Sequence, residues 1–189
     1  MDFHMITTMT NDQTASLWTQ AQELGMPEYA ALMLVSIDKQ TLTLLIAGKV
    51  VDQLPISTSR NGPGNTLDSY QTPTGFHDIN ERYGDGQPPG AILFERVATG
   101  EVVPPSAWQA SSGKDRILTR ILRLNGREPG VNAGGPVDTY ERYVYLHGSD
   151  NEQHLGKQPS SQGCVHVGNH DIIELYDRIH EIPAWCWIG

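Results

Sequence analysis

The segment LMLVSIDKQTLTLLIAGKVVDQLPIST, residues 32–58, decides the fold class. Its first two apolar runs, residues 32–37 and 41–46, are separated by three polar residues, a length typical of a hairpin connection. A second turn containing a glycine precedes the third run, residues 50–58. The segment therefore predicts an antiparallel meander of three short strands.

The rest of the chain extends this β pattern. Its 189 residues fit about one domain, and 19 Gly and 12 Pro beside 7% aromatic residues indicate many turns between short strands. Further strands are predicted at RILTRILRL (116–124) and at ERYVYLHG (141–148). The apolar tail IPAWCWIG (182–189) is expected to form either a last strand or an end that docks on the domain. GREPGVNAGGPVD (126–138) is predicted to be a long loop, and one that could cover a substrate.

Two helices are expected at the ends of this β-domain. DQTASLWTQAQELG (12–25) has its apolar residues on one face and stops at Gly25, before a Met-Pro pair. From His170 the apolar residues recur at helical spacing, with Asn169 placed to cap the helix. We therefore expect residues 1–28 to form a tail and a short helix that packs on a main domain, residues 29–189.

Charge and composition exclude several classes of protein. The chain carries 13 basic and 22 acidic residues, a net charge of −9, which argues against nucleic-acid binding. No apolar run reaches the roughly 18 residues of a membrane helix, so we expect a soluble protein. The first residues have neither the basic nor the apolar part of a signal peptide, so the protein either stays inside the cell or has its export signal outside this chain. The oligomeric state leaves no signal in the sequence.

Candidate catalytic residues gather in YLHGSDNEQHLGKQPSSQGCVHVGN, residues 145–169. A nucleophilic thiol needs a base and donors for the developing oxyanion, so Cys164 is the candidate nucleophile and His147 the candidate base. Gly163 lets a substrate approach the backbone closely. Cys186 lies between two tryptophans and is expected in the core; a single bridge to Cys164 stays open, although two cysteines cannot form a disulfide framework.

A zinc site is the alternative for the same segment. Cys164, His166 and His170 offer a thiolate and two imidazoles, with His147 as a fourth ligand. Their spacing matches no standard zinc finger or ribbon, so the nucleophile interpretation is the stronger one.

The order of several short motifs resembles the L,D-transpeptidases with a YkuD-type catalytic domain. TPTG (72–75) matches a turn of that family, and YGDGQPPG (83–90) and TGE (99–101) resemble one of its branches. The most specific pair is His147-Gly148-Ser149 followed by Ser161-x-Gly163-Cys164-Val165. The resemblance covers most of residues 30–182.

This resemblance implies a mainly β, sandwich-like catalytic domain and a cysteine acyltransferase that acts on peptidoglycan stem peptides. Cys164 would attack the carbonyl before the fourth-position D-alanine, and an amine of a second stem would resolve the thioester as a 3→3 crosslink. His147 would be the base, the Gly148 carbonyl would orient it, and Ser161 would support the site by hydrogen bonding. The resemblance implies no cofactor and no metal.

Two positions depart from the family pattern. Gln162 stands where many members have histidine, and His166 where many have arginine or asparagine; with Gly163 they are expected to contact substrate. His166 replaces the arginine's charge only when it is protonated. Arg120 belongs to a basic group that faces either solvent or the carboxylates of the stem peptide: Lys114, Arg116, Arg120 and Arg123.

Two other functions stay open on the same fold. Water in place of the amine would make the protein an L,D-carboxypeptidase or stem-peptide hydrolase, and a domain without activity would be a peptidoglycan-binding module. The inferred substrate places the protein in the cell envelope or periplasm, although without a visible export signal a cytoplasmic location remains an alternative.

Overall fold

The computed structural model describes residues 10–110, 113 and 115–189, and these residues fold mainly into β-strands, as predicted. In chain order the elements are α1 (Asn11–Glu23), β1 (Ala31–Ser36), β2 (Thr41–Ile46), β3 (Lys49–Ser57), β4 (Gly75–Tyr83), β5 (Ala91–Phe94), β6 (Val97–Val102), η1 (Pro105–Ala107), β7 (Leu118–Gly126), η2 (Gly135–Val137), β8 (Tyr145–Gly148), η3 (Glu152–His154), β9 (Val165–Val167), α2 (Asn169–Arg178) and β10 (Ala184–Ile188). Neither of these α-helices is long and apolar enough to cross a membrane.

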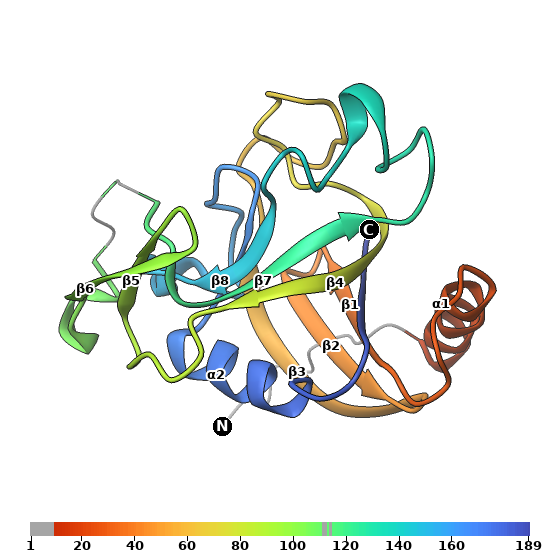
Figure 1. Ribbon diagram of the computed structural model, residues 1–189, viewed down its shortest axis with the longest axis horizontal. Helices are drawn as coiled ribbons and strands as arrows, with labels where there is room; N and C mark the ends of the chain where they lie inside the picture. Colours follow the sequence, from red (N-terminus) through yellow and green to blue (C-terminus); the bar gives the residue numbers. More distant parts are fainter. Residues whose placement is uncertain (1–9, 111–112, 114) are drawn as a thin grey trace.

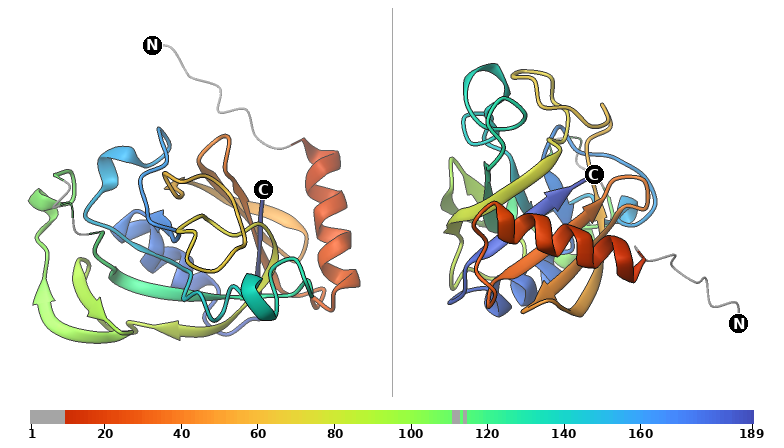
Figure 2. Two further views of the ribbon diagram at one scale, coloured as in Figure 1. Left: turned by 90° about the horizontal axis from the view of Figure 1, so that it is seen from above. Right: turned by 90° about the vertical axis from the view of Figure 1, so that its right-hand side faces the viewer.

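The strands form one sheet that closes on itself. Their order is β4-β10-β1-β2-β3-β9-β8-β7-β5-β6, and β7 also pairs with β4, which joins the two ends of the ring. The β5–β6 hairpin extends beyond this ring, at the opposite side of the molecule from α1 (Figures 1 and 2). The predicted meander is β1–β2–β3, with antiparallel pairing throughout.

Strand β1 is buried on both faces, which explains its continuous apolar sequence. Met33 and Val35 point to the main core inside the sheet, and Leu32 and Leu34 to a second core on its outer side. This division follows the two-residue alternation of side chains along a strand. The outer core is covered by α1, which contributes Trp18 and the fully buried Ala21.

Helix α1 has well-defined ends close to those expected from the sequence. Thr10 and Gln13 form a capping box at its N-terminus, each side chain accepting a hydrogen bond from the other residue's backbone N–H. The helix ends at Glu23 with Leu24 as its C-cap, and Gly25 follows with a φ of +104°, a backbone conformation that favours glycine.

Helix α2 packs with its apolar face against the main core. The expected cap is wrong by one residue, because Gly168 occupies the cap position and Asn169 is already helical. The Asn169 side chain instead donates to the carbonyl of Ser149 and to Glu152, and accepts from the hydroxyl of Thr119, at 2.8, 2.8 and 2.6 Å. It thus ties the start of α2 to β7 and to the turn that follows β8.

The strand expected over residues 141–148 is shorter in the structure. Residues 141–143 form a turn in which Tyr143 has a φ of +54°, and β8 begins only at Tyr145. The predicted loop at residues 126–138 is present. Of the two options for the tail, the strand is the correct one, and it forms β10 in parallel pairing with β1.

Replacement of Leu34 by alanine tests the packing of β1 beneath α1. Leu34 is 1% exposed, so its truncation leaves a cavity and should lower the free energy of unfolding by about 2–5 kcal/mol in urea titrations. The exposed loop residue Val131 provides the control, and its alanine variant should change that energy by less than about 0.5 kcal/mol. Equal, small effects of both replacements would contradict the burial of β1 on its outer face.

Candidate active site

The pairing of β8 with β9 brings the two candidate catalytic side chains together. The strands are parallel, with Leu146 opposite Val165 and His147 opposite His166. Cys164 directly precedes β9, so the two-residue alternation places its side chain on the same face of the sheet as that of His147. Sixteen residues of sequence lie between His147 and Cys164, and the strand pairing brings the two positions close together in space.

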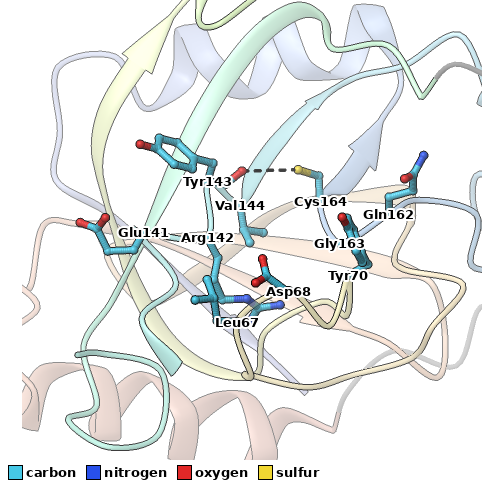
Figure 3. Close-up of a pocket in the computed structure, with 10 residues that line it drawn as sticks. All are labelled: Leu67, Asp68, Tyr70, Glu141, Arg142, Tyr143, Val144, Gln162, Gly163 and Cys164. Carbon is cyan, nitrogen blue, oxygen red and sulfur yellow. Dashed lines mark hydrogen bonds between the residues drawn. The ribbon is translucent and has the colours of Figure 1, made fainter. Parts of the chain in front are cut away.

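Cys164 lies in a cavity of about 370 Å³ formed by three chain segments. The segments are the long loop before β4, the turn before β8 and the loop that carries the cysteine (Figure 3). The lining residues are Leu67, Asp68, Tyr70, Glu141, Arg142, Tyr143, Val144, Gln162, Gly163 and Cys164. A volume of this size accommodates part of a peptide or a small ligand.

The geometry of His147 suits a base. Its Nδ1 lies 2.8 Å from the carbonyl oxygen of Gly148, so Nδ1 donates and Nε2 is left to accept a proton. Burial, and next the charge of the adjacent His166, lower the pKa of His147 to about 4. The imidazole is therefore neutral near pH 7 and ready to take a proton.

The Cys164 thiol is held in its protonated form. Burial raises its pKa to about 12, while a hydrogen bond from the backbone of Tyr145 and the charge of Arg142 act in the opposite direction. The thiol points at the carbonyl oxygen of Tyr143, 3.9 Å from Sγ (Figure 3). It must turn from this carbonyl toward His147 before the proton can move.

Hydrogen bonds shape the loop that carries the nucleophile. The Ser161 hydroxyl donates to the carbonyl of Cys164 at 2.5 Å and accepts from the N–H of Gly163 at 3.2 Å. The buried Thr72, from the TPTG turn, donates to the carbonyl of Gly163 at 2.9 Å. Gly163 has a φ of +130°, which L-residues rarely adopt, so a side chain at this position would strain the loop.

Gln162 and His166 lie in different environments. Gln162 is exposed at the cavity rim, and its backbone N–H donates to Asp115 at 3.0 Å. His166 is fully buried, with Nε2 2.6 Å from the other carboxylate oxygen of Asp115. The structure thus places Gln162 where a substrate can reach it. His166 lies behind the cavity, and its burial does not support the predicted contact with substrate.

Arg120 does not line the cavity. A backbone irregularity at Thr119, with a φ of +71°, breaks the alternation of β7, and the Arg120 guanidinium packs over the ring of Tyr176 in α2. It donates to the carbonyls of Gln87 and Thr119 at 2.8 Å. These contacts hold neighbouring segments of the fold together and turn the guanidinium away from the cavity. Of the other basic residues, Arg116 pairs with Asp150 and Arg123 with Glu81, whereas Lys114 lies outside the described residues.

Comparison with known proteins identifies the family. A model of the L,D-transpeptidase catalytic domain, YkuD, matches residues 30–182. The chain belongs to this family.

Solved structures of L,D-transpeptidases share the fold. One from Mycobacterium smegmatis superposes with a TM-score of 0.52 at 16% identity, over 84% of this chain and 58% of that one. L,D-transpeptidase 3 from Mycobacterium tuberculosis gives a TM-score of 0.51 at 16% identity, over 85% and 61%. The chain thus spans about three fifths of the length of these proteins. No curated protein matches it.

Arg142 is a functional candidate of this L,D-transpeptidase domain that the sequence did not reveal. Its guanidinium donates to the carbonyls of Gly64 and Gln71 at 3.0 and 2.6 Å, and so fixes the loop before β4 over the cavity. The same charge favours the thiolate of Cys164. Arg142 lies in the turn that replaces the first part of the expected strand, and no motif marks it.

The zinc alternative finds little support in this geometry. His170 is exposed and packs edge-on against Trp108, with ring centroids 5.3 Å apart, while His166 contacts Asp115. Within residues 10–110, 113 and 115–189, no group of three or more His, Cys, Asp or Glu side chains is arranged to hold a metal ion.

The raised pKa of Cys164 predicts an unusual pH dependence of alkylation. Iodoacetamide reacts with the thiolate, so its rate should rise about tenfold per pH unit between pH 7 and 9.5 without a plateau. Intact-protein mass spectrometry measures the rate, and a Cys164→Ala variant corrects for slow reaction at the buried Cys186. A plateau with its midpoint below pH 8 would show a thiolate already formed in the resting domain.

Proposed function

We propose that the protein is a cysteine acyltransferase that acts on the stem peptides of peptidoglycan. The observation that carries this proposal is the placement of Cys164 in a cavity, on the same face of the sheet as a buried histidine whose Nε2 is free to accept a proton. Membership of the L,D-transpeptidase family supports the same reaction class.

In the first step the tetrapeptide donor acylates Cys164. His147 Nε2 takes the proton from the Cys164 thiol, and the sulfur attacks the carbonyl carbon before the fourth-position D-alanine. Backbone N–H groups of the cysteine loop would stabilise the oxyanion. Collapse of the tetrahedral intermediate breaks the peptide bond, and the imidazolium of His147 returns the proton to the leaving D-alanine amine.

In the second step an amine of another stem peptide attacks the thioester. His147, neutral again, accepts the amine proton and the sulfur leaves as the thiolate, which then takes that proton back. The product is a 3→3 crosslink, with the third residue of the donor joined to the third-position side chain of the acceptor. Water in place of the amine would instead release a tripeptide, the carboxypeptidase outcome.

A relative with the same fold has been solved with an adduct of a β-lactam. L,D-transpeptidase 3 from Mycobacterium tuberculosis has been solved with a faropenem-derived adduct, at a TM-score of 0.50 and 16% identity, over 85% of this chain and 60% of that one. We extend from this that Cys164 is acylated by β-lactams of this class. The substrate would place the reaction in the cell envelope, outside the cytoplasmic membrane.

Product analysis with a purified disaccharide-tetrapeptide tests the proposal. The wild-type protein should release D-alanine and produce crosslinked dimers whose mass is that of two donors less one D-alanine. The Cys164→Ala variant should give neither product, because no thioester can form. Liquid chromatography with mass spectrometry measures both products.

The other outcomes separate the alternative functions. Tripeptide without dimers would replace transpeptidation by carboxypeptidase activity, and retention of the tetrapeptide by an unreactive protein would indicate a binding module. Dimers formed by the Cys164→Ala variant would contradict the assignment of the nucleophile.

A further inference from the structure

Asp115 contacts two residues of the candidate site, Gln162 and His166. One carboxylate oxygen lies 2.6 Å from Nε2 of the buried His166, and the other accepts the backbone N–H of Gln162 at 3.0 Å. Gln162 stands two residues before the nucleophile, and His166 two residues after it. The single side chain of Asp115 therefore holds the chain on both sides of Cys164.

His166, which Asp115 contacts, also packs against the candidate base His147. The rings of His147 and His166 pack edge to face, with centroids 5.1 Å apart, on the neighbouring strands β8 and β9. Both imidazoles are at most 1% exposed, so water screens their interaction weakly. A displacement of His166 would therefore displace the ring of His147.

We propose that Asp115 is a positioning residue of the acyl transfer, holding the Cys164 loop through Gln162 and the base His147 through His166. This inference rests on the proposed function for its effect on the reaction rate, but not for its effect on the histidines. Asp115 lies on the segment before β7 and is not itself one of the residues that line the cavity. It acts through the two residues that it binds.

The charged groups around His147 and His166 affect the pKa of His147 in opposite directions. Asp115 and Asp150 favour the protonated form of His147, and the charge of His166 opposes it. Asp150 is paired with Arg116 at 3.3 Å, and Ser149 faces Nδ1 of His166. Removing the carboxylate should therefore lower the pKa of His147, and removing the imidazole of His166 should raise it.

NMR titration of the His147 ring in the full chain tests the electrostatic part. In Asp115→Asn, His147 should stay neutral to a lower pH than in the wild type, and in His166→Gln it should protonate at a higher pH. A His147→Gln spectrum assigns the signal. If Asp115 only kept the loop folded, its loss would admit water and raise the pKa of His147 in Asp115→Asn, which would overturn the proposal.

The rate of acylation tests the positioning part. With faropenem as the probe and intact-protein mass spectrometry as the readout, Asp115→Ala should slow acylation of Cys164 by about 10–100-fold, the effect expected of a misplaced reacting group. Asp115→Asn should recover part of this loss, because its amide oxygen can still accept the Gln162 N–H. Asp52→Asn removes a remote ion pair with Arg178 and should change the rate less than about twofold.

The NMR titration and the acylation rate together distinguish a failure of the proposed function from a failure of the role proposed for Asp115. Without acylation of the wild-type protein the proposed reaction with β-lactams fails, while the titration still decides the role of Asp115. Acylation of Asp115→Ala at the wild-type rate would overturn the positioning role.

Discussion

The short parallel pairing of β8 and β9 is the constraint on which the site depends. Parallel strands need a crossover connection, and here residues 149–164 provide one that contains the cysteine loop. A shift of the register by one residue would turn either His147 or Cys164 to the other face of the sheet. The pairing is held from both sides, by β7 next to β8 and by β3 next to β9.

The sequence predicted the regular parts of the fold because they follow local patterns. Apolar runs and turn residues marked β1–β3, and helical spacing marked α2, but the cap at Asn169 was wrong because its side chain bonds to residues distant in sequence. The motif predicted Cys164 and His147 as partners. Arg142 and Asp115 could not be predicted, since each acts through backbone groups of another loop that only the tertiary structure brings near.

Burial gives the site its resting state. It raises the pKa of the Cys164 thiol and lowers that of His147, so both groups are neutral at rest and the nucleophile forms only when the proton passes between them. Such a pair protects the cysteine from indiscriminate reaction, because the thiolate is the reactive form. The charge of Arg142 favours the thiolate of Cys164, and the charge of Asp115 favours the protonated form of His147.

The most direct test of the central claim is to trap the acylated protein. Rapid quenching after mixing with a disaccharide-tetrapeptide, before the thioester is resolved, should give a mass increase equal to the donor less D-alanine. The added mass should lie on the Cys164 peptide and be removed by hydroxylamine, as a thioester requires. Release of D-alanine with no adduct on Cys164, or an adduct on another residue, would contradict the mechanism.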